Sequence, residues 1–209
     1  MVKVAAPALS LDASGSIAGA MTFSKWKGRN YVRMLVKPAN PKSAAQTGMR
    51  AGMKFLSQNW TVRSAAEKAT WEDRAEAIAV SPFNAFTKYN LTRWRNFLSP
   101  TKEDPAAEAQ TADLNTAEGA SPGERQISVV FTAANITTQN WGVAIYRELV
   151  TGFTCTWDKC IAVLPCASGG AVVYVDSPLE PDQYFYNFKT FTEDGVWSAD
   201  LTEVNATVT

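Results

Sequence analysis

The clearest pattern of apolar and polar positions lies between residues 17 and 37. Ile17, Met21 and Phe23 fall on one face of an extended segment, and after residue 30 apolar and polar side chains alternate again through Val36. A period of two residues indicates β-strands. Gly28 lies between the two runs and can adopt a positive φ at little steric cost. The pattern therefore predicts a β-hairpin with its tip at residues 25–30. A two-stranded hairpin is marginal in water, so we expect it to lie on its own helices or on another subunit.

Three helical segments are expected after the hairpin. Ser43 with Gln46, and Ser64 with Glu67, have the spacing of a capping box, and Ser81-Pro82 is typical of a helix start. The helices are predicted at about 44–58, at 64–79 and from Pro82 onward. Their expected core faces carry Met49, Met53, Leu56 and Phe55; Trp71, Ala75 and Ile78; and Phe83, Phe86, Asn90, Trp94 and Phe97. Gly48 and Gly52 lie four residues apart in the first helix, which predicts a close packing partner there.

The chain changes character beyond residue 100. Residues 101–123 are polar and acidic, and they predict a linker that includes a short strand near Thr111–Leu114. Short β-type runs then follow one another between breaks rich in Gly, Pro and Asp, which favours an all-β sandwich over 124–209. The expected strands are 126–132, 141–148, 152–157, 171–175, 184–191 and 196–208. We thus predict an α+β N-terminal domain over 1–100, a linker and a sandwich.

Charge is divided unevenly between the halves, although the net charge is zero. Residues 1–102 contain 16 Lys or Arg and 5 Asp or Glu, a net charge of +11, and residues 103–209 contain 4 and 15, a net charge of −11. This split favours contacts with acidic partners or head-to-tail stacking of copies, and two independently solvated domains are the alternative. The N-terminus lacks the apolar core of a signal peptide, and no run has membrane-spanning length. We therefore expect a protein made in the cytoplasm, without a membrane partner.

The absence of histidine narrows the possible chemistry. It excludes Ser-His-Asp and Cys-His catalytic pairs and His-ligated zinc. Cys155, Cys160 and Cys166 have no CxxC spacing, so we interpret them as buried free thiols rather than as a metal site or a disulfide. An enzyme would need a Ser-Lys pair, a carboxylate pair or an all-oxygen metal site. We therefore expect this protein to have no enzymatic activity and to bind no cofactor, metal ion or small-molecule substrate.

Two segments resemble known families. Residues 14–98 are similar to a family of phage and prophage proteins, on a Gly-rich strand, a W-K-G-x-x-Y-x-R tip and an A-x-Q-x-x-x-R helix. The positions that carry this resemblance are Gly15, Gly19, Trp26, Lys27, Gly28, Tyr31, Arg33, Pro41, Gln46, Arg50 and Asn84-Ala85-Phe86. The resemblance implies a structural role in a virion and provides no catalytic residue.

The C-terminal segment resembles the fibronectin type III family. Leu179-Glu180-Pro181 precedes a strand with Tyr184, Tyr186 and Phe188 on one side, and Asp194-Gly195-Val196-Trp197-Ser198 follows it. The distance from Pro181 to Tyr184 is one residue shorter than in that family. The resemblance implies an immunoglobulin-like sandwich at the C-terminus.

The leading hypothesis is a non-enzymatic virion protein, either a capsid decoration protein or a tail accessory. Its partners would be other virion proteins and copies of itself, after assembly in the host bacterial cytoplasm. The expected partner-binding residues are Lys25, Trp26, Lys27, Gly28, Arg29, Tyr31 and Arg33, because aromatic residues and arginine are enriched at binding hot spots. Binding of nucleic acid by the same basic hairpin is one alternative. A carbohydrate-binding platform of Trp141, Trp157 and Trp197 is another.

Overall fold

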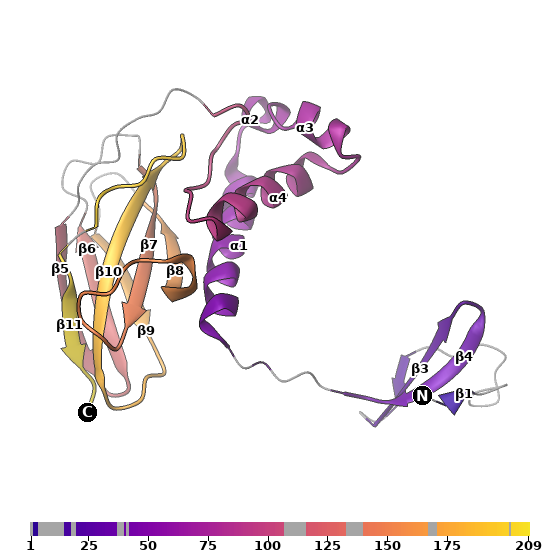
Figure 1. Ribbon diagram of the computed structural model, residues 1–209, viewed down its shortest axis with the longest axis horizontal. Coiled ribbons are helices and arrows are strands. Elements are labelled where there is room, and N and C mark those ends of the chain that lie inside the picture. The colour runs from indigo at the N-terminus through magenta and orange to yellow at the C-terminus, as the bar shows by residue number, and fades with distance from the viewer. Residues whose placement is uncertain are drawn as a thin grey trace. The chain divides into compact units, whose positions relative to one another are not determined.

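The structure is a computed structural model that describes residues 2–3, 15–17, 20–36, 40, 42–106, 116–132, 140–166, 171–200 and 202–209 (Figure 1). It divides into two compact units, Met1–Pro41 and Lys42–Thr209. Helices and antiparallel strands make up the second unit, and strands alone are described in the first. The units are treated separately below.

The N-terminal unit contains a four-stranded antiparallel sheet with the strand order β1-β4-β3-β2. The predicted hairpin is present as β3 (Met21–Trp26) and β4 (Arg29–Met34), joined by Lys27 and Gly28. The prediction placed Ile17 in the same strand as Met21. In the structure β2 (Gly15–Ile17) is a separate strand that pairs with β3, and β1 (Val2–Lys3) pairs with β4.

Four α-helices follow among the described residues of the second unit. α1 (Ala44–Val62) ends four residues later than expected. Its N-cap Ser43 makes no side-chain capping hydrogen bond, so the predicted capping box with Gln46 is wrong. The second capping box is confirmed. Ser64 and Glu67 cap one another at the start of α2 (Ala65–Ala69), but the expected single helix breaks near Trp71 before α3 (Glu72–Ala77). Ser81 and Pro82 begin α4 (Pro82–Arg95) as predicted.

The strands of the second unit form two antiparallel sheets with the orders β5-β6-β9 and β11-β10-β7-β8. The strands are β5 (Thr116–Gly123), β6 (Gln126–Thr132), β7 (Asn140–Glu148), β8 (Cys160–Pro165), β9 (Ala171–Asp176), β10 (Gln183–Thr192) and β11 (Val204–Thr207). The sheets face one another across an apolar core that includes Ile127, Val129, Phe131, Val143, Ile145, Tyr184, Tyr186 and Phe188. The predicted grouping of Tyr184, Tyr186 and Phe188 on one side of their strand is thereby confirmed.

Several predicted strands differ from the structure. Residues 153–156 carry no strand, and a 3₁₀ turn, η2 (Trp157–Lys159), leads into β8, which was not predicted. The expected long last strand is reduced to β11 and one bridge between Phe191 and Trp197. β5 lies in the predicted linker, and the strand expected at Thr111–Leu114 lies outside the described residues.

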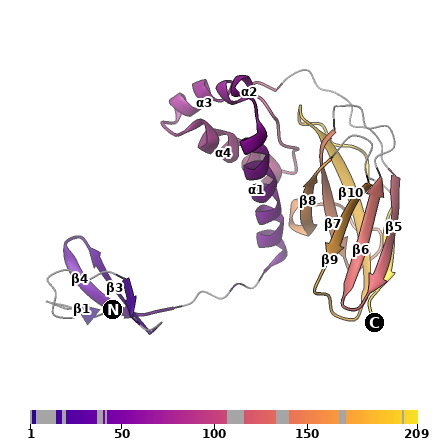
Figure 2. The same cartoon turned by 180° about the vertical axis from the view of Figure 1, so that it is seen from behind.

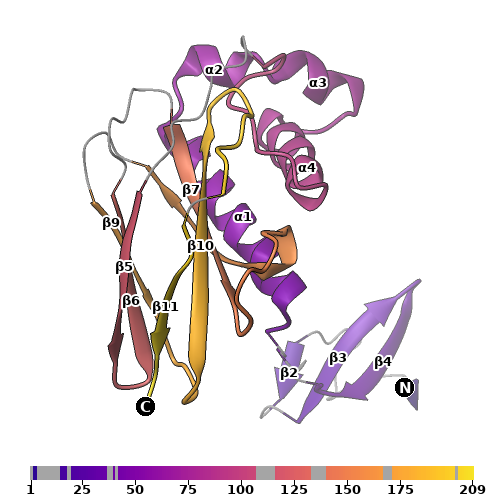
Figure 3. The same cartoon turned by 60° about the vertical axis from the view of Figure 1, so that its left-hand side comes forward.

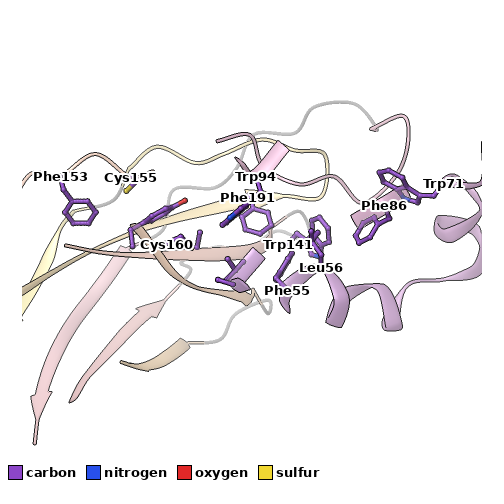
Figure 4. Packing of buried hydrophobic residues seen from close by; sticks show 14 residues of the cluster. Phe55, Leu56, Trp71, Phe86, Trp94, Trp141, Phe153, Cys155, Cys160 and Phe191 are labelled. Carbon is purple, nitrogen blue, oxygen red and sulfur yellow. The ribbon is translucent and has the colours of Figure 1, made fainter. Parts of the chain in front are cut away.

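α1 covers the outer face of the β11-β10-β7-β8 sheet (Figure 3) and lies beside β8 in the rear view (Figure 2). Figure 4 shows Phe55 beside Trp141 and Phe191, and its ring centroid lies 5.0 Å from that of Trp141 and 5.2 Å from that of Phe191. The ring of Trp94 in α4 lies 5.7 Å from that of Trp197. Trp141 reaches the helices because the pairing of β7 with β10 shifts register at this position. The second unit therefore has three layers, two sheets and one layer of helices.

The sequence predicted a domain boundary at residue 100, but in the structure the helices before it and the strands after it share one core, and the division between the two units falls between Pro41 and Lys42. Phe55 of α1 contacts Trp141 and Phe191, and Trp94 of α4 contacts Phe191, so the buried residues of the helices belong to one cluster with those of β7 and β10. The segment after α4 is also packed. Ser99 and Thr101 are buried, and the Asn90 amide exchanges two hydrogen bonds with the backbone of Thr101. Helices and sandwich thus form one compact unit with a common core.

Candidate interaction site on the N-terminal sheet

The tip of the hairpin is a two-residue turn. Lys27 and Gly28 have φ angles of 48° and 76°, and Trp26 pairs with Arg29 across the strands. Two consecutive left-handed residues define the primed turn, whose twist matches that of the flanking strands. Glycine is therefore favoured at position 28 because it adopts the positive φ of this turn without strain. A Cβ added there would meet nothing within 4 Å, so steric space does not require glycine at this position.

One face of the hairpin combines aromatic and cationic side chains. Residues directly opposite one another share a face of the sheet, and the register pairs Trp26 with Arg29, Ser24 with Tyr31 and Thr22 with Arg33. Trp26, Arg29, Tyr31 and Arg33 consequently lie on a single face, which we call the cationic face. Lys27 adds a further charge, because its Nζ lies 4.8 Å from the centroid of the Trp26 ring.

The opposite face is apolar. The register pairs Met21 with Met34, Phe23 with Val32 and Lys25 with Asn30, so Lys25 lies away from the other predicted site residues. We call these four hydrophobic residues, Met21, Phe23, Val32 and Met34, the apolar face. The predicted site did not include them, although their alternation along the two strands marks them as one face. The structure therefore brings four of the seven predicted residues onto one face, places Lys27 beside it and separates Lys25 from it.

Neither face is covered within the described part of the unit. No described side chain between residues 15 and 40 is buried. Trp26 is 65% exposed and Met34 is 79% exposed, although hydrophobic residues of this size normally occupy cores. Exposed apolar area of this kind marks interaction surfaces. The N-terminal unit is also strongly basic, with six Lys or Arg and one Asp in residues 1–41.

The second unit offers little to support nucleophilic chemistry by its thiols. Cys155, Cys160 and Cys166 are free, and the first two are buried as predicted. Burial raises the pKa of Cys155 to about 12 and that of Cys166 to about 11, so both thiols are protonated near neutral pH. Among the described residues, no cluster of three or more Cys, Asp or Glu side chains is arranged to hold a metal ion.

The proposed carbohydrate platform is not present as an exposed surface. Trp141 is 5% exposed, and its Nε1 donates a hydrogen bond to Asn59 of α1 at 2.8 Å. Trp157 and Trp197 are partly buried against the same helix–sheet core. All three tryptophans therefore belong to the packing between layers, where a sugar ring has no access to a shared stacking face.

A charged cluster joins three segments of the second unit. Lys102 Nζ lies 2.6 Å from Glu67 of α2 and 2.9 Å from Glu193, which follows β10. Burial raises the pKa of Glu67, but hydrogen bonds from Lys102 and Ser64 outweigh that effect and lower the pKa to about 2. Because Lys102 bridges Glu67 of α2 and Glu193 after β10, the cluster holds the helices against the sandwich, and we interpret its role as structural.

An apolar cavity of about 260 Å³ lies between α3 and α4. The residues that line it include Ile78, Tyr89, Leu98, Lys88 and Arg93.

No described helix of the chain is both long enough and apolar enough to traverse a bilayer.

Comparison with known proteins finds no matching family model and no matching curated protein. Among solved structures, a β-1,2-glucanase from Parabacteroides distasonis aligns at 21% identity and a TM-score of 0.37, over 49% of this chain and 13% of that chain. The PKD domain of an M14-like peptidase from Thermoplasmatales archaeon SCGC AB-540-F20 aligns at 20% identity and a TM-score of 0.32, over 46% of this chain and 92% of that domain. The chain thus spans only a small part of the glucanase. Neither likeness is close enough to carry an argument about function.

Proposed function

We propose that this chain is a non-enzymatic structural protein of a phage virion, anchored to the particle through its N-terminal sheet. One observation carries the proposal: no described side chain of this sheet is buried, although Trp26 is 65% exposed and Met34 is 79% exposed, and Val36, just after β4, is 71% exposed. A small sheet needs a packed hydrophobic face for stability. A partner surface that covers the exposed hydrophobic side chains of the sheet, Trp26 on the cationic face included, supplies that packing.

Charge supports a partner of acidic character. The N-terminal unit carries a net charge of +5 and residues 42–209 a net charge of −5. Arg29 and Arg33 project from the cationic face together with Trp26 and Tyr31, and these residue types dominate binding hot spots. The resemblance of residues 14–98 to phage and prophage proteins favours a partner among capsid or tail subunits. The second unit then acts as a brace or spacer.

We also propose that the sandwich is of the fibronectin type III kind. Counted along the chain from β5, its sheets have the orders 1-2-5 and 7-6-3-4, which is the arrangement expected for a seven-stranded immunoglobulin-like sandwich of that family. Tyr184 Oη donates a hydrogen bond to the Glu180 carbonyl oxygen at 3.1 Å, four residues upstream. This contact has the geometry of a tyrosine corner.

The test is incorporation of variants into purified particles. The double substitution Trp26→Ala and Arg29→Ala removes the most exposed aromatic residue and one cation from the same face, and we expect incorporation to fall at least tenfold, since hot-spot truncations cost about 2 kcal/mol each. Leu149→Ala is the matched control, because Leu149 is 50% exposed in the second unit. Unchanged incorporation of a correctly folded double variant would refute the anchoring role.

Nucleic acid is the second candidate partner, favoured by the shared face of Trp26, Arg29, Tyr31 and Arg33. Aromatic rings stack on bases and arginines neutralise phosphates, so this face suits a single strand. Binding of a fluorescent oligonucleotide that weakens steeply with added salt supports this candidate. Absence of binding at low salt eliminates it.

A further inference from the structure

The outer strand of the β5-β6-β9 sheet is left open on one side. β9 pairs with β6 through six consecutive residues, from Ala171 opposite Thr132 to Asp176 opposite Ile127, with no shift of register. Its other edge has no neighbouring strand in the described structure. The peptide groups on that edge are therefore available to another extended chain.

The remaining edges of the two sheets are protected in ways that β9 is not. β5 contains Pro122 and a register shift between Ala117 and Gly119, both of which disrupt pairing. β8 lies against α1 and ends at Pro165, and β11 has only four residues. β9 contains no Pro, Gly, Lys or Arg, so it lacks the usual features that prevent edge-to-edge association.

The side chains along β9 are apolar on the solvent side as well. Val173 is 56% exposed and Val175 is 50% exposed, and both alternate with Val172 and Tyr174, which face the sandwich core. A β-branched residue that is half exposed on an open edge gains burial from a second strand. Val130 of β6 lies opposite Val173 and extends this apolar strip inward across the sheet.

We propose that β9 is a homotypic pairing site at which β9 of a second copy adds in antiparallel orientation, giving a continuous six-stranded sheet. The two-fold axis passes near Val173, so Val173 lies opposite its own copy and Ala171 lies opposite Val175 of the partner. Directly opposite residues share a face, and this register matches exposed side chains with exposed ones and core-facing side chains with core-facing ones.

A second copy fits this edge better than a charged partner strand does. Residues 171–175 carry no charge, so self-pairing places no like charges opposite one another. The charge that follows, Asp176, is turned inward, where its Oδ2 accepts hydrogen bonds from Arg147 at 2.7 Å and from Tyr186 at 2.9 Å.

Sedimentation velocity of the full chain tests the proposal. Small interfaces are weak, so measurements extend to about 200 μM, where the wild-type protein should show a reversible dimer. Val173→Lys should weaken the dimer at least tenfold, because the ammonium groups of the two copies would meet at the axis. Val150→Lys is the control, since Val150 is 65% exposed in a turn outside β9. A monomeric wild-type protein, or equal effects of both substitutions, would overturn the proposal.

Cross-linking tests the register. In a Cys166→Ser background, Val173→Cys should form an intermolecular disulfide under mild oxidation, because directly opposite Cβ atoms lie about 5 Å apart. Val175→Cys should not cross-link to itself, and the opposite result would overturn the two-fold at Val173. This site is independent of the N-terminal sheet, so the Trp26→Ala, Arg29→Ala variant should dimerise normally. Loss of particle anchoring and loss of dimerisation can therefore be distinguished.

Discussion

Gly48 of α1 lies directly against the main chain of Trp157, so that a Cβ added to Gly48 would overlap the Trp157 carbonyl oxygen. Four residues later, a Cβ on Gly52 would lie 3.1 Å from the Trp94 indole ring. The two glycines thus let α1 approach the sandwich on one side and α4 on the other. This contact explains why helices and strands share one core.

The first prediction concerns this approach. Gly48→Ala should destabilise the second unit by about 2 kcal/mol or more, although alanine favours an isolated helix by about 1 kcal/mol, because the neighbouring atom is backbone and cannot rotate away. Urea unfolding followed by tryptophan fluorescence measures the change. Gln58→Ala, at an exposed position of the same helix, should change stability by less than about 0.5 kcal/mol. Equal stability of the Gly48 variant and wild type would contradict the close approach.

The second prediction concerns the end of α3. Ala79 has a φ of 52°, and the Ala79 and Val80 amides donate to Glu76 and Ala75, which is the Schellman arrangement with alanine where glycine is usual. Ala79→Gly should raise stability by about 0.5–1 kcal/mol. Ala77→Gly, inside α3, should lower stability by about 1 kcal/mol. A loss of stability in both variants would contradict the left-handed cap.

A third prediction follows from the pKa of Glu67. Because the folded pKa of about 2 lies below the ordinary value of 4.5, the charged carboxylate stabilises the fold above pH 4.5, and this stabilisation disappears as the pH falls toward 2. Glu67→Gln should therefore lower stability at pH 7 by about 1–2 kcal/mol, and the difference from wild type should vanish near pH 2. Unfolding titrations at several pH values measure this difference. Gln58→Ala, an exposed and uncharged position, is the control and should leave the pH dependence of stability as in the wild type.

The fourth prediction concerns the three thiols. Burial raises the pKa of each, so none should react rapidly with a disulfide reagent at pH 8 in the native protein, and all three should react after unfolding. Cys166 should be the first to react natively as the pH approaches 11. Fast native labelling of Cys155 or Cys160 near neutral pH would show that the helix–sheet core is open.

Features that depend on neighbouring residues could be predicted from the sequence. Gly28 indicated the hairpin turn, Ser64 and Glu67 indicated a capping box, and alternation placed Tyr184 and Phe188 on one face of β10. In each case the determining contacts lie within a few residues of one another. The same local reasoning identified the four residues of the cationic face. It also included Lys25, which the two-residue turn places on the other side of the sheet.

Features that depend on distant contacts could not be predicted in this way. α1 is rotated so that Ala51 and Phe55 are buried while Met53 is 37% exposed, because the glycines and Phe55 meet the sandwich. Trp141 turns toward α1 only because β7 shifts its register against β10. β8 is a short apolar run without alternation, since α1 covers it on one side and the other sheet lies on the other.

Hydrogen–deuterium exchange of the full chain, free and in purified particles, tests the anchoring role most directly. Peptides covering β3 and β4 should exchange quickly in the free protein, because the described sheet lacks a core of its own, and should become at least tenfold more protected in the particle. Peptides of β7 and β10 should be protected in both states. Equal exchange of β3 and β4 in the two states, with the protein demonstrably present in the particle, would contradict the account.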